Sequence, residues 1–423
     1  MSVVIGYTLK QIGAFINSIY RLIYTIKENE MHVWGILFKC RPPLGTSREE
    51  NMIKYHKAIC SASEVLKGRQ YILNLTESQV VLVECKNDVY NLERHPFFIH
   101  AIFDEAVWLK SLRIDDFLTY VESLEYPNIE VLFLWSIGRC GSTMLAACFE
   151  ALDGCVSISE PADIFEAWIY RKEYGSELYQ RLLEATLKYH LYQVRLQKPH
   201  TKLVLIKPFS FTFWYATQSN NIQRFHHIFM YRDLDSYLES SAIFTKVFGK
   251  VRPLKRFSFI ANAVDFERII DEGVKSLINA VALFSQSKAN LIMEELEKEM
   301  YFSNCMTAIG TPTLYYIYTQ LEKLDKINLI SVRYEDVQAD IVSVFQQLLT
   351  HINRTPSDEE LQRVISSKSK DSQANTTLSS FNKTKLYDPL MPRRHELACN
   401  VLKILDLEYM TEKGAKLPKT IVV

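Results

Sequence analysis

The chain has 423 residues, of which 48% are hydrophobic and 23% charged, and this is the composition of a globular protein with room for about two or three domains. Its 49 Lys and Arg balance its 49 Asp and Glu, so nucleic acid and anionic membranes are not expected as main partners, because both select for an excess of positive charge. A local basic pocket is compatible with this balance.

The first segment, residues 3–24, is predicted to be an amphipathic helix. Its apolar residues recur every three or four positions, and Lys10 and Arg21 interrupt the apolar run. Because charges at mid-bilayer are costly, no integral membrane segment is expected. We expect the apolar stripe to dock on the protein's own body, with contact to a membrane surface or to a partner as the alternative. The stripe consists of Ile5, Leu9, Ile12, Ile16, Ile19 and Ile23.

A small α+β unit is predicted next. Residues 32–40 and 70–85 are rich in Val, Ile, Leu and aromatic residues, which is typical of strands. Residues 97–124 have helical spacing, and Pro127 ends the helical pattern because proline disfavours helix at the residue before it. We therefore place the end of an N-terminal unit, residues 1–126, at this point.

The chain then changes to alternating strands and helices. Residues 130–135 are a short apolar run that enters a glycine-containing turn, and residues 141–150 leave the turn with helical periodicity. Strand, glycine loop and helix open a doubly wound domain, so we expect an α/β fold with a three-layer parallel sheet in residues 127–350. Later apolar runs predict three further strands, at 203–206, 227–231 and 327–332, with helical stretches between them.

The turn after the first of these strands has the features of an anion-binding loop. It consists of Ser136-Ile-Gly-Arg-Cys-Gly-Ser-Thr143. A loop that leads into a helix presents free backbone N–H groups and the positive end of the helix dipole. Gly138 and Gly141 let the backbone approach a ligand, and Ser142 and Thr143 add hydroxyl donors.

The loop is not a Walker A sequence, because GxxxxGK[ST] requires a Lys after the second glycine and none follows Gly141. Its cation is Arg139 instead. Gly138-Arg-Cys-Gly-Ser-Thr143 resembles the 5′-phosphosulfate loop of the sulfotransferase family, which has the form G-R-S-G-[ST]-[ST] in the carbohydrate and protein branches. Cys140 stands where that form has Ser.

A second segment resembles the 3′-phosphate motif of the same family. That motif is a strand that ends in Arg-Asp-Pro, with a Ser eight residues after the Arg, and Arg232 and Ser240 fit this spacing. Leu234 replaces the usual Pro. An Arg at the end of a strand can bind phosphate oxygens with two hydrogen bonds, and a Ser two turns into the next helix can reach the same group.

Three shorter matches lie in the family's order. Glu160, before Pro161, matches a Glu-Pro that faces the acceptor in the family, and Lys207 ends a predicted strand where members place a Lys or His near the reacting group. Residues 332–336, Val-Arg-Tyr-Glu-Asp, resemble a family segment that we interpret as structural. The resemblance spans Glu130 to Asp336, which is roughly half of the 423 residues.

The resemblance implies a donor, a reaction and a set of site residues. The donor is 3′-phosphoadenosine 5′-phosphosulfate (PAPS), no metal is involved, and the sulfuryl group moves to a hydroxyl or amine of a small-molecule or glycan acceptor. Fixed donors must stabilise charge on the moving group and on the leaving phosphate. Arg139, Lys207 and Glu160 are the implied catalytic residues, with Glu160 as the candidate base. The implied nucleotide-binding residues are Gly138, Arg139, Cys140, Gly141, Ser142, Thr143, Arg232 and Ser240.

The rest of the chain constrains function only weakly. Residues 351–423 are expected to form C-terminal helices and, as the resemblance implies, a loop near Lys368 and Lys370 that covers the nucleotide. The eight cysteines form no CxxC pair and no Cys/His cluster with zinc-finger spacing, which argues against a structural zinc site. Scattered thiols favour a reducing compartment, whereas four Asn-x-Ser/Thr triplets favour the opposite, so the localisation stays open, with the cytoplasm favoured over the Golgi lumen.

Two alternatives to a sulfotransferase stay open. One is another P-loop enzyme, such as a nucleotide kinase, which would need the Walker Lys and an Asp that holds magnesium. The other is a catalytically inactive nucleotide-fold protein that engages a partner through residues 1–126, which match no pattern of the family.

Overall fold

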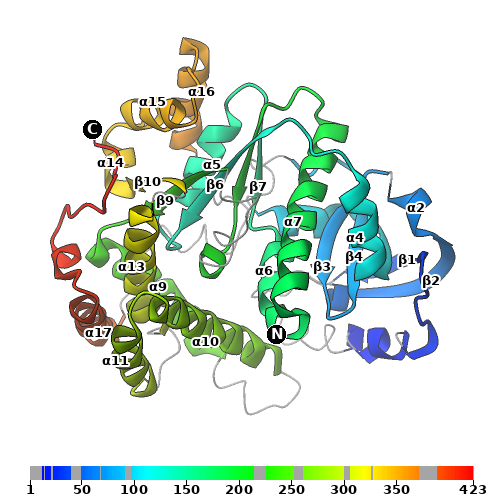
Figure 1. The fold of residues 1–423 in the computed structure, drawn as a ribbon, viewed down its shortest axis with the longest axis horizontal. Coiled ribbons are helices and arrows are strands. Elements are labelled where there is room, and N and C mark those ends of the chain that lie inside the picture. The colour runs from blue at the N-terminus through cyan, green and yellow to red at the C-terminus, as the bar shows by residue number, and fades with distance from the viewer. Residues whose placement is uncertain are drawn as a thin grey trace. The chain divides into compact units, whose positions relative to one another are not determined.

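The computed structural model contains ten strands in two five-stranded sheets among its described residues, one sheet antiparallel and one parallel (Figure 1). The predicted α/β fold with a parallel sheet and a small N-terminal α+β unit is therefore confirmed. No described helix is long and apolar enough to cross a membrane. Contacts divide the chain into unit 1, Met1–Val131, Gly154–Pro208 and Ser258–Asn262, and unit 2, Leu132–Asp153, Phe209–Phe257 and Ala263–Val423. The described residues are 12–13, 15–20, 22–39, 49–66, 68–90, 97–213, 225–251, 261–299, 305–324, 327–370 and 388–422.

Unit 1 contains the whole antiparallel sheet, in the strand order β2-β1-β5-β4-β3. The strands predicted from residues 32–40 and 70–85 are confirmed as β1 and as the hairpin β3–β4. The Thr76 hydroxyl stabilises the hairpin turn by accepting a hydrogen bond of 3.0 Å from the Gln79 N–H. The five strands are β1 (Glu30–Lys39), β2 (Met52–Ser61), β3 (Tyr71–Leu75), β4 (Gln79–Cys85) and β5 (Ala106–Arg113).

One predicted element of unit 1 is wrong. Residues 97–124 do not form a single helical segment, because β5 separates helix α3 (Phe98–Glu105) from helix α4 (Ile114–Ser123). β5 is the central strand of the antiparallel sheet and pairs with both β1 and β4. Its apolar residues fit a buried helix or a buried strand equally well, and pairing with two distant strands decides between them.

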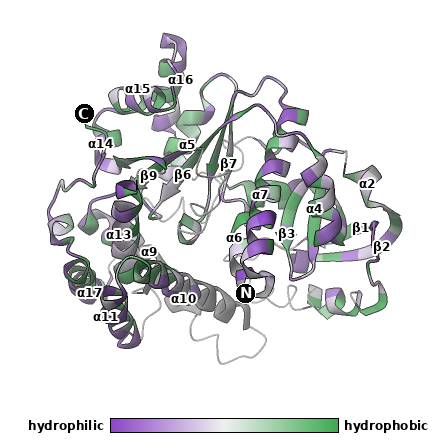
Figure 2. Ribbon diagram, in the orientation of Figure 1, coloured by the Kyte–Doolittle hydropathy of each residue, from purple (hydrophilic) through white to green (hydrophobic). Residues whose placement is uncertain are grey.

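The N-terminal helix docks on unit 1 through a different face from the predicted one. Its described residues within 12–23 are largely hydrophobic (Figure 2). Gly13 and Asn17 are buried, and the Asn17 amide donates to the Glu49 carbonyl at 3.2 Å. A Cβ on Gly13 would lie 2.3 Å from the Glu50 carbonyl oxygen, so this close approach requires a small residue. Three residues of the predicted docking stripe are instead exposed, namely Ile12, Ile19 and Ile23, whereas Ile5 and Leu9 lie outside the described residues.

Unit 1 also contains two parallel strands that carry part of the predicted site. Strands β7 (Cys155–Ser159) and β8 (Leu203–Lys207) pair with each other, and both are buried along their whole length. β8 was predicted and β7 was not. Helices α6 (Ala162–Ile169) and α7 (Arg171–Gln197) connect them, as the helical pattern of the sequence indicates.

Unit 2 contains three parallel strands in the order β10-β9-β6, with β6 counted from Leu132. All three were predicted, and their interior residues are buried except Ile330 of β10, which is partly exposed. The strands are β6 (Glu130–Ser136), β9 (His226–Tyr231) and β10 (Asn328–Arg333), and the helices used below are α5 (Ser142–Glu150), α9 (Leu234–Val251), α10 (Ala261–Ala282) and α14 (Tyr334–Ala339). Further helices of unit 2 are α11 (Gln286–Glu297), α13 (Gly310–Lys323), α15 (Ile341–His351), α16 (Asp358–Ser369) and α17 (Met391–Ile404).

Candidate functional site

The glycine loop connects β6 to α5 in unit 2, and its backbone is shaped for close approach of a ligand. Gly138, Arg139 and Gly141 have φ angles of 75°, 50° and 84°, in the left-handed region that favours glycine. Gly141 directly precedes α5, and no side chain caps this helix. Ser142 and Thr143 are buried in its first turn. The first N–H groups of α5 therefore lack intrahelical acceptors and, with the helix dipole, favour an anion at this end.

The backbone of strand β9 holds one side of the loop through hydrogen bonds. The Ile137 N–H donates to the Met230 carbonyl at 3.3 Å. The Cys140 thiol donates to the same carbonyl at 3.4 Å and is fully buried. The Cys140 side chain therefore faces the strand, so a ligand above the loop would meet Cys140 at its backbone.

Tyr334, the first residue of α14, packs against both the loop and Arg232. A Cβ added to Gly141 would lie 2.5 Å from Cδ2 of the Tyr334 ring. The Arg232 guanidinium lies over the same ring, 4.5 Å from its centroid, in a cation–π arrangement. This contact was not predicted from the sequence, in which residues 332–336 were interpreted as structural.

Two arginines from different elements meet at the loop. Arg139 Nε donates to the Ser240 carbonyl, and Arg232 Nη1 donates to the Arg139 carbonyl, each at 3.4 Å. Burial and the charge of Arg232, in that order, lower the pKa of Arg139. The structure thus brings Arg139, Arg232 and Ser240 together, although Ser240 makes this contact with its carbonyl and not with its hydroxyl. Two guanidinium groups that repel each other in a half-buried place favour an anion beside them.

Glu335 lies on another side of Arg232. Its Oε1 is 3.5 Å from Arg232 Nε, and its Oε2 accepts a hydrogen bond of 3.3 Å from the Asp233 N–H. Burial raises the pKa of Glu335. Arg232 Nε itself is buried and makes no hydrogen bond. The Arg232 side chain as a whole is 23% exposed, so solvent still reaches part of the guanidinium.

The other two predicted catalytic residues form an ion pair in unit 1. Lys207 Nζ lies 2.6 Å from Glu160 Oε1 and 3.3 Å from the Ser159 hydroxyl oxygen. The Lys207 side chain is 3% exposed, and the Glu160 side chain is 24% exposed. Glu160 has a φ of 57°, which is unfavourable for a residue with a Cβ, and its N–H donates to the Lys207 carbonyl at 2.6 Å. This backbone geometry holds the carboxylate beside the ammonium group while solvent still reaches it.

The predicted site residues therefore fall into two groups. Residues 138–143, Arg232 and Ser240 belong to unit 2, and Glu160 and Lys207 belong to unit 1. Residues 371–387, which include most of the expected covering loop, lie outside the described residues. Within the described part of the chain, no group of three or more His, Cys, Asp or Glu side chains could hold a metal ion.

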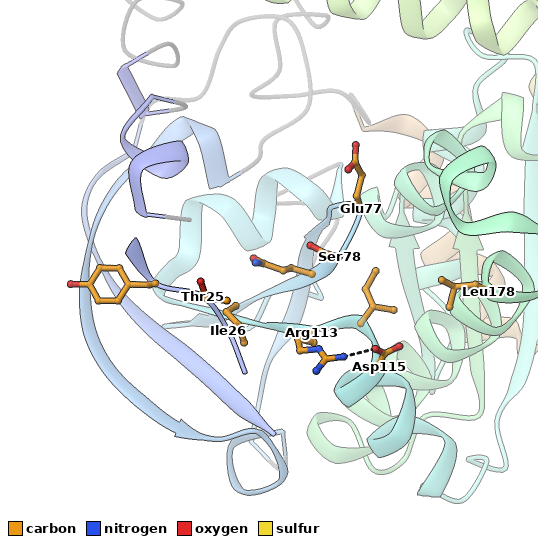
Figure 3. A pocket seen from close by; sticks show the side chains of 10 residues that line it. Thr25, Ile26, Glu77, Ser78, Arg113, Asp115 and Leu178 are labelled. Atoms are coloured by element: carbon orange, nitrogen blue, oxygen red, sulfur yellow. Dashed lines mark hydrogen bonds and ion pairs between the residues drawn. The ribbon is translucent and has the colours of Figure 1, made fainter. Parts of the chain in front are cut away.

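A separate pocket of about 420 Å³ lies in unit 1 (Figure 3). Its walls come from the segment after the N-terminal helix, the β3–β4 turn, the start of α4, and Leu178 of α7. Arg113 and Asp115 form an ion pair of 2.7 Å on its wall, and the side chains of both are exposed by more than a third. None of the predicted site residues lines this pocket.

No family model matches the sequence, and no curated protein matches it. Among solved structures, the chain is similar to the crystal structure of mouse sulfotransferase SULT7A1 complexed with PAP, with a TM-score of 0.36 and 11% sequence identity. The match covers 71% of this chain and 94% of that chain. At this level of similarity, the match supports no inference about individual residues.

Proposed function

We propose that the chain binds PAPS through the glycine loop and the two arginines of unit 2 and transfers its sulfuryl group to a hydroxyl or amine of an acceptor. The observation that carries this proposal is that Arg139 and Arg232 meet at the uncapped N-terminus of α5. Backbone N–H groups and two guanidinium groups would meet an anion there. The sequence supports the identity of the anion, because the loop and the Arg232–Ser240 segment resemble the 5′- and 3′-phosphate motifs of sulfotransferases.

The residues fit a nucleotide that carries two separate phosphate groups. Arg139 and the loop amides would hold the 5′ side, and Arg232 with Ser240 would hold the 3′-phosphate. The pKa of Arg139 is lowered by burial and by the charge of Arg232, so an anionic ligand beside the two guanidinium groups would relieve this unfavourable arrangement. A nucleotide kinase would need a Lys after the second glycine of the loop, and none follows Gly141.

In the proposed reaction, the S–O bond to the 5′-phosphate breaks as a new S–O bond to the acceptor oxygen forms. The hydroxyl proton of the acceptor passes to the Glu160 carboxylate, and the products are a sulfate ester and 3′-phosphoadenosine 5′-phosphate (PAP). Lys207 orients Glu160 through their 2.6 Å ion pair and contributes positive charge. Removing one such fixed donor typically lowers the rate by about 10²–10³-fold.

Calorimetric titration with PAP tests the nucleotide site directly. We expect micromolar binding to the wild-type chain and a loss of affinity of at least about tenfold in Arg232→Ala, because this variant loses a charge-assisted donor. ATP lacks the 3′-phosphate and should not bind. Arg363→Ala is the matched control, because it removes a surface ion pair with Asp153 in the same unit and should leave PAP affinity unchanged.

Three outcomes would contradict the proposal. If the folded wild-type chain does not bind PAP, the proposed donor site does not exist. Equal binding of ATP and PAP would favour another P-loop enzyme. Tight PAP binding without transfer from PAPS to any of a panel of hydroxyl and amine acceptors would favour a catalytically inactive binding protein.

A further inference from the structure

The N-terminal helix turns a second apolar face toward solvent. Phe15, Leu22 and Ile23 are 68%, 83% and 64% exposed. Together with the exposed Ile12 and Ile19 they form one side of the helix: Ile12, Phe15, Ile19 and Leu22 follow one another at spacings of three or four residues, and Ile23 lies four residues after Ile19. Isolated exposed apolar residues are common on protein surfaces, but a continuous helical stripe of five is not.

The opposite side of this helix is fixed to the antiparallel sheet of unit 1. The Tyr20 ring lies 5.2 Å from the Trp34 ring, and the Tyr24 ring stacks on His56 with 4.3 Å between centroids. Gly13 approaches the Glu50 carbonyl so closely that no larger residue would fit. The helix is therefore held by its polar and aromatic side, and the apolar stripe is turned away from the sheet that anchors it.

We define the five exposed residues of this stripe as the N-terminal apolar patch, namely Ile12, Phe15, Ile19, Leu22 and Ile23.

The charge of this segment indicates which surface the patch fits. Residues 1–27 include Lys10, Arg21 and Lys27 and no Asp or Glu, whereas the chain as a whole has a net charge of +0. Positive charge beside an exposed apolar helical stripe is the pattern of a helix that lies in the interface of a bilayer. Apolar side chains then enter the acyl boundary, and the cations meet anionic headgroups.

We propose that the N-terminal apolar patch binds the surface of a bilayer that contains anionic lipids, with the helix lying in the plane of the interface. The patch would thereby hold unit 1 at the membrane. This binding requires neither the glycine loop nor the Glu160–Lys207 pair, so it is independent of the proposed transfer reaction.

Flotation of the full chain with phospholipid vesicles tests the proposal. We expect binding to vesicles of phosphatidylcholine with phosphatidylserine, and clearly weaker binding to pure phosphatidylcholine. Phe15→Glu and Leu22→Glu should each lower the vesicle-bound fraction by about tenfold or more, because each removes a large apolar side chain from the interface. Leu283→Glu, at a 67% exposed leucine just after α10 in unit 2, is the matched control and should bind as the wild type does.

Phe15, Leu22 and Leu283 are exposed, so substitution at these positions should not prevent folding. Circular dichroism and PAP titration check that each variant is folded. The proposal is overturned if the wild type does not float, or if Phe15→Glu and Leu22→Glu float as the wild type does. Equal binding to neutral and anionic vesicles overturns the role assigned to the cations. If the wild type does not bind vesicles but self-associates, and Leu22→Glu does not self-associate, the patch binds a second copy of the chain instead of a membrane.

Discussion

Tyr334 links two sequence motifs that lie about a hundred residues apart. One face of its ring supports the Arg232 guanidinium, and its edge lies where Gly141 has no side chain. An aromatic ring from a third segment of unit 2 therefore fixes the position of Arg232 relative to the loop. Positioning of this kind matters because a misplaced guanidinium loses most of the energy of a bidentate phosphate contact.

We therefore expect Tyr334→Ala to weaken PAP binding by about tenfold, because it removes a cation–π contact worth about 1–2 kcal/mol and frees Arg232 to take other rotamers. Tyr334→Phe keeps the ring and should bind PAP as the wild type does. Calorimetry on both variants provides the measurement. Similar losses in both would show that the phenol hydroxyl, and not the ring, supports the site.

Gly138 and Gly141 offer a comparison between two glycines of one loop. Both have positive φ, but a Cβ on Gly138 would meet no atom within 4 Å, whereas a Cβ on Gly141 would meet the Tyr334 ring at 2.5 Å. Gly138→Ala should lower the free energy of unfolding by about 1 kcal/mol through backbone strain alone. Gly141→Ala should lower it by at least about 2 kcal/mol and should also abolish PAP binding. Urea unfolding of the two variants measures the difference, and equal losses would count against a packing role for Gly141.

Part of the candidate site has a local signal in the sequence, and part of it does not. Arg139, Arg232 and Ser240 could be named because two short segments resemble family motifs, and each motif is local in the sequence. The position of Tyr334 depends on β10 lying beside β9, and the inward orientation of Cys140 depends on the Met230 carbonyl. Such contacts join distant segments, so no local pattern encodes them.

At the scale of elements, the N-terminal helix rests on a buried cluster of aromatic and imidazole rings. His32 lies 5.2 Å from His56 and is 1% exposed, and neither of its ring nitrogens makes a hydrogen bond. Burial, followed by the charge of His56, lowers the pKa of His32, while Glu30 acts in the opposite direction. Burial also lowers the pKa of His56.

These shifts predict that helix docking weakens in mild acid. The folded state favours the neutral form of both histidines, because their pKa values are lowered from the ordinary histidine pKa of 6.5. Their contribution to the stability of the folded state is therefore complete above pH 6.5 and is lost as the pH falls toward the lowered pKa values. The protection factors of amide hydrogen exchange at residues 12–24, which are corrected for the intrinsic pH dependence of exchange, should therefore fall between about pH 7 and pH 5. His32→Phe should flatten this dependence, whereas His200→Phe, at an exposed histidine of the same unit, should not. Protection factors that are independent of pH in the wild type would exclude this coupling.

Elements with a strong local signal could be predicted, and those decided by pairing could not. β6, β8, β9 and β10 are short apolar runs between turn residues, and each was recognised. β5 has the same composition as a buried helix, and only its place between β1 and β4 makes it a strand. The docking face of the N-terminal helix was also missed, because close approach to the sheet selected Gly13 over the larger apolar residues.

For the molecule as a whole, unit 1 combines the N-terminal sheet with the segment that carries Glu160 and Lys207. Glu166 accepts a hydrogen bond of 2.5 Å from the Leu75 N–H, and Gln193 accepts one of 3.2 Å from the Gln70 N–H. Both bonds join residues that are about a hundred positions apart, so no local pattern predicts them. The N-terminal sheet thus supports the helices that follow Glu160 in unit 1.

This support predicts a loss of stability in Glu166→Leu. The variant leaves the buried Leu75 N–H without its acceptor, and an unsatisfied buried donor costs about 1–3 kcal/mol. Glu177→Leu, at an exposed position of helix α7 in the same unit, controls for the removal of a charge. Urea unfolding followed by circular dichroism measures the difference, and equal stabilities would show that the bond to Leu75 contributes little.

The division of the site residues between two units predicts that binding and chemistry can be separated by mutation. Glu160→Gln removes the proposed base but keeps the shape of the side chain, so it should leave PAP affinity within about twofold and lower transfer from PAPS by about 10²–10⁴-fold. Arg232→Ala should instead lose PAP affinity, because Arg232 acts on the nucleotide.

Glu84→Gln is the control, since Glu84 forms another ion pair of unit 1, with Lys110. Transfer of a labelled sulfuryl group and calorimetry on the same preparations measure the two quantities. Loss of PAP affinity in Glu160→Gln would place Glu160 in nucleotide binding, and unchanged transfer would require a different base.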